Sequence, residues 1–277
     1  MEIIDTLLAI DPNYLLVGLI ILFFVLETFF NRRERVNVGN KFKHLFHNFL
    51  FQLLAIAIGS ILGFMIVTTF DTISTYQLGL FNWIEVPYWF KVITGLFLLD
   101  LSDYWFHRWD HKIPLLWRQH RVHHSDTTMD ASTALRQFPT ELIYFTFGEM
   151  VISMIFGIDI MSMNLFLLII LPLFFLQHAR LNYPPWTDKI FGWLLMTPNH
   201  HKVHHEQDQF FTDSNYGTIF IIWDMLFGTF KTKPVEEINY GLKEFEGAEK
   251  QSFWYQVRSP FINIKRIEDE VPIEKKI

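Results

Sequence analysis

The sequence predicts an all-α integral membrane protein, a helical bundle of about four spans with additional membrane-associated helices. Two bulk observations support this fold class. Hydrophobic residues make up 51% of the 277-residue chain, and the mean hydropathy of +0.20 is high for a soluble domain. Aromatic residues reach 17%, which is typical of surfaces that face lipid and the membrane interface. Long uncharged runs, described next, are the third observation.

Two runs in the N-terminal part of the chain are long enough to span a membrane. Residues 13–30 are apolar except for Glu27, and they are long enough to cross a hydrocarbon core of about 30 Å. A signal peptide fits this run poorly, because acidic rather than basic residues precede it. Residues 47–70 contain no charged side chain. We therefore expect both runs to be membrane spans.

Three further runs follow. Residues 87–99 are shorter and contain Lys91, and they continue with helical spacing toward the first histidines. Residues 142–158 and 160–177 are almost uncharged and are separated by Asp159, which predicts a hairpin of helices. The remaining part of the chain, about 100 residues, is polar enough to lie outside the membrane.

Charges between the runs predict an orientation. The linker after the first run carries five Lys and Arg residues, whereas the N-terminus and residues 71–87 carry acids and no Lys or Arg. Because basic loops stay inside, the linker should be cytoplasmic, and each later histidine group then falls on the cytoplasmic face. This pattern favours a multi-pass protein of a bacterial inner membrane over one of the endoplasmic reticulum.

Composition excludes several classes of site. The net charge of −6 argues against a nucleic-acid partner. The absence of cysteine excludes disulfides, thiolate zinc sites and iron–sulfur clusters. A bound metal would therefore need nitrogen or oxygen ligands.

Ten of the 12 histidines lie in short groups along the chain, and this clustering is the main functional signal. Helical residues three or four apart share a face, so each group can present several rings to one region. Adjacent histidines diverge by roughly 100° on a helix, so neighbours favour two metals over one. The grouped residues are His107 and His111, then His120, His123 and His124, then His178, and finally His200, His201, His204 and His205.

Not every histidine needs a metal. His44 and His47 are isolated near a membrane face, and we interpret them as structural. His200 can be an outer partner or have no role at a metal. Imidazole suits iron, zinc, copper and nickel, and a structural zinc needs only four ligands. An iron pair fits best, while a zinc-dependent membrane hydrolase and a histidine-rich metal transporter remain alternatives.

The order HRWDH, HRVHH, a lone histidine and TPNHHKVHH closely resembles the fatty acid hydroxylase/sterol desaturase superfamily, as do the downstream stretches DSNYG and WDMLFGTF. The resemblance covers roughly residues 96–230. It implies a membrane-bound di-iron oxygenase that hydroxylates or desaturates a fatty acyl, sterol-like or ether lipid. The reaction would use O2 and a separate electron donor of the cytochrome b5 or ferredoxin type.

The resemblance also implies a ligand set for the two iron ions, which zinc can replace in recombinant protein. A family segment that often carries histidine reads LRQFPTE here, so Phe138 receives no metal role. The implied ligands are His107, His111, His120, His123, His124, His178, His201, His204 and His205.

Two further expectations concern an outer partner and the domain boundaries. Asp103 follows helical spacing with His107 and His111, and metal-bound histidine usually donates its second N–H to a carboxylate or carbonyl. Asp103 is therefore our candidate outer partner. We divide the chain into an N-terminal transmembrane region (1–94), a fatty acid hydroxylase-like catalytic domain (95–231) and a cytoplasmic C-terminal tail (232–277).

Overall fold

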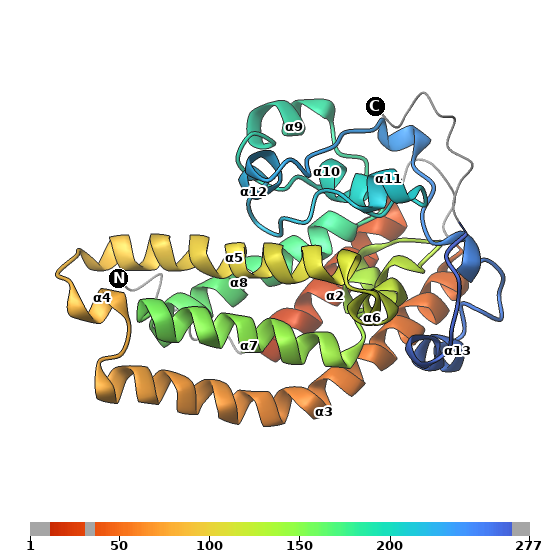
Figure 1. The fold of residues 1–277 in the computed structure, drawn as a ribbon. Coiled ribbons are helices and arrows are strands. Elements are labelled where there is room, and N and C mark those ends of the chain that lie inside the picture. The colour runs from red at the N-terminus through yellow and green to blue at the C-terminus, as the bar shows by residue number, and fades with distance from the viewer. Residues whose placement is uncertain (1–11, 31–36, 268–277) are drawn as a thin grey trace.

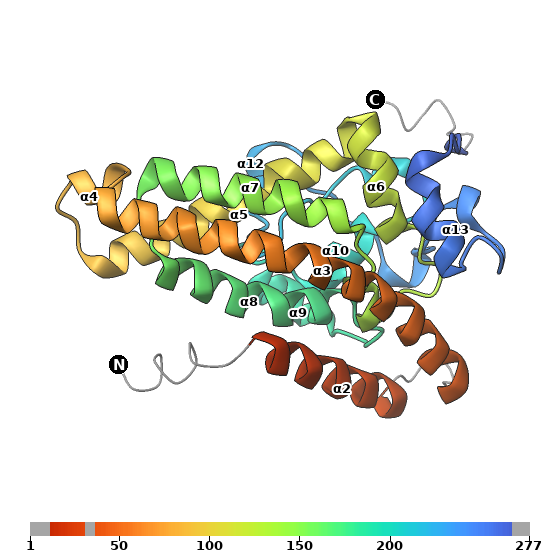
Figure 2. The same ribbon diagram turned by 90° about the horizontal axis from the view of Figure 1, so that it is seen from below.

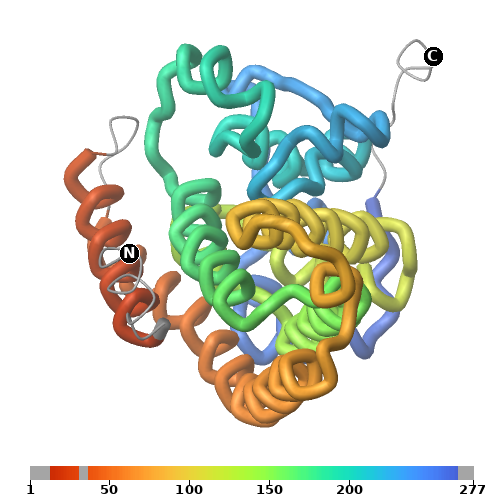
Figure 3. Tube along the Cα trace, turned by 90° about the vertical axis from the view of Figure 1, so that its left-hand side faces the viewer, coloured from red at the N-terminus to blue at the C-terminus, as the bar shows by residue number. Residues whose placement is uncertain are grey.

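Five long helices form the body of the protein in a computed structural model that describes residues 12–30 and 37–267. They run roughly along a common axis, and most of the short helices are gathered at one end (Figures 1 and 2). Viewed along that axis, α2 stands at the edge of the bundle (Figure 3). The described residues contain no strand, only two isolated β-bridges. The long helices are α2 (Pro12–Phe30), α3 (Val38–Tyr76), α5 (Tyr88–Lys112), α7 (Pro139–Phe156) and α8 (Ile160–His178).

Three of these segments are long and apolar enough to cross a membrane: Asn13–Phe30, Val38–Trp83 and Ile160–His178. Helix α3 has 39 residues, or about 58 Å at 1.5 Å per residue, so it extends beyond a hydrocarbon core. Its Phe64 side chain is 76% exposed, like many other large apolar side chains on the bundle. An apolar outer surface of this kind is suited to lipid contact. The protein is therefore an integral membrane protein.

The remaining two runs form α5 and α7, which are not among the helices long and apolar enough to cross a membrane. Helix α5 is continuous from Tyr88 to Lys112, so it carries the third run directly into the first histidine group, as predicted. Helices α7 and α8 form the expected hairpin. Gly157 ends α7 at a φ of +73°, and Asp159 caps α8 by accepting from the Ser162 N–H at 2.8 Å.

The hairpin turn lies against the short helix α4 (Leu80–Trp83). Both are at the end of the bundle opposite the other short helices (Figure 1). A side chain at Gly79 would come within 2.0 Å of the Gly157 backbone nitrogen, so this close approach requires glycine. Residues 71–87, predicted to face away from the cytoplasm, therefore lie opposite the histidine-bearing end. Arg32, Arg33 and Arg35 of the first linker lie outside the described residues.

Short helices and loops form a cap over the other end of the bundle. Arg121 of α6 ties the C-terminal segment to this cap, because its guanidinium donates to the carbonyls of Ser259, Ile262 and Ile264. The short elements of the cap are α6 (Pro114–His124), η1 (Ala131–Leu135), α9 (Pro185–Phe191), α10 (Pro198–His204), α11 (Gln209–Thr212), α12 (Ile222–Leu226), η2 (Val235–Glu237), η3 (Lys243–Phe245), α13 (Phe253–Arg258) and η4 (Ser259–Phe261).

Candidate metal centre

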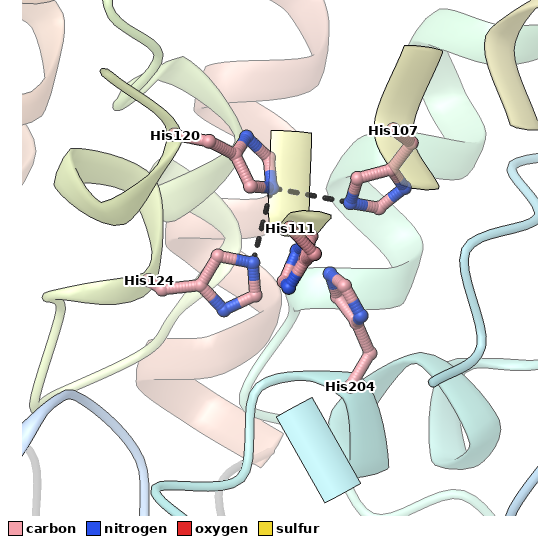
Figure 4. A group of neighbouring side chains, drawn as sticks. All are labelled: His107, His111, His120, His124 and His204. Atoms are coloured by element: carbon pink, nitrogen blue, oxygen red, sulfur yellow. Dashed lines mark hydrogen bonds between the residues drawn. The ribbon is translucent and has the colours of Figure 1, made fainter. Parts of the chain in front are cut away.

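Nine histidines converge where the cap meets the bundle, and they form two separate groups. In each group one ring nitrogen from every member lies within 4.8 Å of all the others. All nine are the residues predicted as ligands. The five-histidine group, shown in Figure 4, consists of His107, His111, His120, His124 and His204, and the four-histidine group consists of His123, His178, His201 and His205.

Three helices build the five-histidine group. Helix α5 supplies His107 and His111 from one face, α6 supplies His120 and His124, and α10 supplies His204. The Nε2 atom of His120 lies 3.1 Å from Nε2 of His107 and 3.1 Å from Nε2 of His124 (Figure 4). A spacing of four residues on α5 and on α6 therefore produces the convergence that the sequence predicted.

The four-histidine group is centred on His178, at the end of α8. Its Nε2 lies 3.0 Å from Nε2 of His123, 3.1 Å from that of His205 and 3.1 Å from that of His201. One ring nitrogen cannot form three hydrogen bonds to other ring nitrogens. Two nitrogens bound at right angles, about 2.1 Å from a common ion, would lie about 3.0 Å apart. The spacing therefore fits ligands around a metal.

Adjacent histidines fall into different groups. The rings of His123 and His124 are inclined at 89°, and those of His204 and His205 at 90°. The groups nevertheless touch, because the His124 and His205 rings stack with centroids 4.5 Å apart. The arrangement therefore offers two neighbouring metal positions, with each member of a pair serving its own.

Backbone carbonyls fix the orientation of three rings. The Nδ1 atom of His107 lies 2.8 Å from the Tyr216 carbonyl oxygen, that of His178 lies 2.7 Å from Phe174, and that of His204 lies 2.6 Å from Ser214. A carbonyl can only accept, so Nδ1 carries the proton in each ring. The Nε2 lone pair then points into the group, which is the form that binds a metal.

The loop that provides two of these carbonyls is held by a buried carboxylate. Asp224 accepts from the backbone N–H groups of Tyr216 and Gly217, both at 2.8 Å. Gly217 is required here, because a Cβ would come within 2.4 Å of the Phe220 carbonyl oxygen. This network explains why DSNYG and WDMLFGTF accompany the histidine motifs.

Two carboxylates form hydrogen bonds with ligand histidines, and sequence reasoning missed both. Glu141 Oε2 lies 2.8 Å from Nδ1 of His120, while its Oε1 accepts from the Phe138 N–H at 2.9 Å. Asp213 Oδ1 lies 3.3 Å from Nδ1 of His111. A signal for Glu141 was present, because a glutamate three residues after the start of a helix often caps it.

The expected role of Asp103 is not what the structure shows. His107 directs Nδ1 to the Tyr216 carbonyl instead, and Asp103 Oδ1 is buried without a hydrogen-bond partner in the described part of the chain. Helical spacing placed Asp103 on the correct face of α5. The loop at 214–217 reaches the His107 ring from the other side, and such a contact cannot be predicted from the periodicity of one helix.

The other histidines lie outside both groups. His44 sits between two buried carboxylates, with Nε2 2.9 Å from Asp126 and Nδ1 3.0 Å from Asp130. His47 also belongs to neither group. The His200 ring packs edge-on against Phe230, and its Nδ1 has no hydrogen-bond partner among the described residues. These positions agree with a structural role for His44.

Burial favours the neutral form of most histidines in the two groups. Burial, together with the neighbouring rings, lowers the pKa of His204 to about 3. It also holds the pKa values of His124 and His205 well below their usual range. His120 differs, because the negative charge of Glu141 outweighs burial and raises its pKa. Neutral imidazole is the ligand form, so most of the site is ready to bind metal at neutral pH.

A cavity of about 540 Å³ runs from the histidines into the bundle. His107, His120, His123 and His201 form part of its wall, so it reaches both groups. Most of the remaining wall is apolar and comes from α2, α7 and α8. Such a volume is typical of small-molecule sites.

Comparison with known proteins agrees with this architecture. Residues 92–229 match the family model for fatty acid hydroxylase. The chain is 36% identical over 176 residues to alkylglycerol monooxygenase from Danio rerio, covering 58% of this chain and 35% of that protein. It is 34% identical over 176 residues to the Homo sapiens protein of the same name, covering 60% and 36%.

A more distant relative is cholesterol 25-hydroxylase from Mus musculus, 28% identical over 149 residues, covering 53% of this chain and 48% of that protein. The alignments thus span about a third of the length of the alkylglycerol monooxygenases. No solved structure gives a significant match. The matched region contains all nine histidines of the two groups, and the chain belongs to the fatty acid hydroxylase/sterol desaturase superfamily.

Proposed function

We propose that this protein is a membrane-bound di-iron oxygenase that hydroxylates or desaturates a lipid with O2 and electrons from an external donor. Among fatty acyl, sterol-like and ether lipids, hydroxylation of an ether lipid fits the alkylglycerol monooxygenase relatives best. The observation that carries the proposal is the pair of adjoining histidine groups at the head of an apolar cavity. Iron bound in both groups would supply the activation of dioxygen and the oxidation of an unactivated C–H bond.

The residues of the chain would prepare the site for this reaction. Carbonyl acceptors hold the rings with Nε2 pointing inward, and Glu141 and Asp213 orient His120 and His111. The apolar cavity would align the lipid and keep bulk water away from the oxidised carbon. Placement of the substrate to within about an ångström would decide between hydroxylation and desaturation.

Electrons would enter from the aqueous side of the cap, from a separate donor of the cytochrome b5 or ferredoxin type. The Trp117 ring supports this route, because its centroid lies 5.0 Å from the His111 ring and 5.7 Å from the His124 ring. The guanidinium of Arg266 lies 4.7 Å from the centre of the same ring, and the Lys112 side chain is half-exposed nearby. Positive charge at this face suits an acidic donor.

We also propose that the histidine end of the bundle faces the cytoplasm of a bacterial inner membrane. The loop at 71–87, which carries acids and no Lys or Arg, lies at the opposite end. The three segments 1–94, 95–231 and 232–277 would then serve as membrane anchor, catalytic region and cytoplasmic tail.

The alternatives fit less well. A metal transporter needs ligands along a path through the membrane. The nine histidines instead converge in two adjoining groups, and Glu27 is already paired with Lys41 at 2.9 Å. A zinc hydrolase needs three protein ligands and one open position for water. Two adjoining groups of five and four histidines exceed that requirement.

Purification without oxygen, followed by metal analysis and ¹⁸O2 turnover on a lipid panel, tests the proposal. We expect about two iron ions per chain, O2 consumption that depends on a reductant, and ¹⁸O in any hydroxylated product. Zinc-loaded protein serves as the matched control and should be inactive. Turnover by the zinc form without O2 or reductant would instead establish a hydrolase.

A further inference from the structure

Besides Glu141, which contacts His120, two buried carboxyl groups line the cavity. Asp103 belongs to α5 and Glu149 to α7, and their residues are 3% and 7% exposed. They are close enough to interact electrostatically. Most of the surface of this cavity is apolar, and two interacting acids are unusual there.

One oxygen of this pair has no donor within the described part of the chain. Asp103 Oδ1 is buried and has no hydrogen-bond partner there. The nearby Asp100 shows the usual pattern, since it accepts from the N–H groups of Ile219 and Phe220 and from the Trp223 indole. A buried acceptor without a donor costs free energy. Asp103 therefore lacks a donor that a bound molecule can supply.

The position of the pair relates it to the chemistry. Asp103 precedes His107 by one helical turn, or about 6 Å along α5. His107, His120 and His123 line the same cavity. The same wall includes apolar side chains such as Leu167 and Leu168. A polar group held by Asp103 would thus lie a few bonds from a carbon placed at the histidines.

We propose that Asp103 and Glu149 accept hydrogen bonds from hydroxyl groups of the lipid substrate and so place a carbon close to those hydroxyls at the oxidation site. This inference rests on the proposed oxygenase function and specifies its substrate class. The substrate is a neutral lipid alcohol that is oxidised near its hydroxyl-bearing end. Free fatty acids and phosphorylated lipids are disfavoured, because an anionic group is costly to bury in a mostly apolar cavity whose described lining contains no Lys or Arg.

Lipid binding to the full-length, metal-free protein in nanodiscs tests the site independently of turnover. We would compare 1-O-hexadecylglycerol with its 2,3-di-O-methyl ether, which keeps the chain and the ether but loses both donors. Two additional hydrogen bonds predict binding of the diol about tenfold to a hundredfold tighter. Palmitate should bind more weakly than the diol, and hexadecylamine tests whether the donor is an amine.

Variants connect the preference to the two acids. Asp103→Leu/Glu149→Leu should bind both ethers with equal affinity while retaining wild-type metal content, because replacing both members of a buried polar pair by apolar side chains is usually tolerated. Asp103→Asn should give an intermediate preference. Leu168→Ala is the matched control: it alters the apolar wall and should weaken both lipids alike, leaving their ratio unchanged.

The outcomes separate this inference from the proposed function. Equal binding of the two ethers by the wild-type protein, or an unchanged preference in the double Leu variant, would overturn the hydroxyl site. Tighter binding of hexadecylamine than of the diol would also overturn it, in favour of a cationic lipid. If the diol preference holds but iron-loaded protein oxidises no lipid, the site stands and the oxygenase proposal fails.

Discussion

Glu141→Gln should selectively weaken one of the two metal positions. The carboxylate of Glu141 accepts twice, from the Phe138 N–H at 2.9 Å and from Nδ1 of His120 at 2.8 Å. Glutamine has one acceptor oxygen, so its amide N–H2 group must face one of these donors. Glu141 is 3% exposed, and water cannot readily replace the lost contact.

The size of the effect follows from the contact. A hydrogen bond to a charged group is worth about 1.5–3 kcal/mol, which corresponds to about a 10- to 150-fold loss of affinity. Loss of an outer partner of a ligand histidine typically costs about 10- to 100-fold in metal affinity. Because His120 belongs to the five-histidine group, only that group should be weakened.

Chelator competition with metal analysis would measure this effect. The wild-type protein should release its two metals over a similar range of chelator concentration, whereas Glu141→Gln should lose one metal well before the other. Glu27→Gln is the control: it removes a buried carboxylate that accepts from two backbone N–H groups but contacts none of the nine histidines. Equal weakening of both metals, or no weakening, would refute the assignment of Glu141.

Other perturbations probe the rest of the site. His123→Ala and His124→Ala should each deplete a different metal position and abolish turnover with the fold intact; X-ray absorption that places both rings on one ion would contradict this. His44→Ala should leave metal content near normal but destabilise the protein by about 3–5 kcal/mol, because two buried aspartates lose their partner; denaturant unfolding measures the loss. The cysteine-free chain allows a clean topology test, in which Glu249→Cys should react only from the cytoplasm and Glu85→Cys only from outside. Labelling of Glu249→Cys in sealed cells by an impermeant reagent would reverse the orientation.

Local periodicity predicted which histidines within one helix can converge. His107 and His111 share a helical face at a spacing of four, and so do His120 and His124 on α6. His120 and His123, three residues apart, lie in different groups, and spacing alone left that choice open. The roughly 100° divergence of adjacent residues also predicted that His123 and His124 point into different groups. Uncharged length likewise predicted α2, α3 and α8, because a membrane span must satisfy a simple length requirement.

The outer partners of His107 and His111 could not be predicted in this way, because they come from distant parts of the chain. His107 pairs with a carbonyl 109 residues away, and His111 with a carboxylate 102 residues away. The same limitation explains the wrong role given to Asp103, which was correctly placed on α5 but faces the cavity. Helical spacing determines the face of a residue, whereas the fold of the cap determines what meets that face.

The position of the histidines at one end of the bundle reconciles two opposing requirements. A lipid substrate needs an apolar approach, which helices α7 and α8 provide, but neutral imidazoles need polar partners for their second nitrogen. Within a span, a helix has already used most of its backbone carbonyls for its own hydrogen bonds. Loops of the cap have free carbonyls, and Ser214 and Tyr216 provide two of them to His204 and His107. Oxidation of a lipid by histidine-bound metal therefore favours a site where membrane helices end and irregular backbone begins.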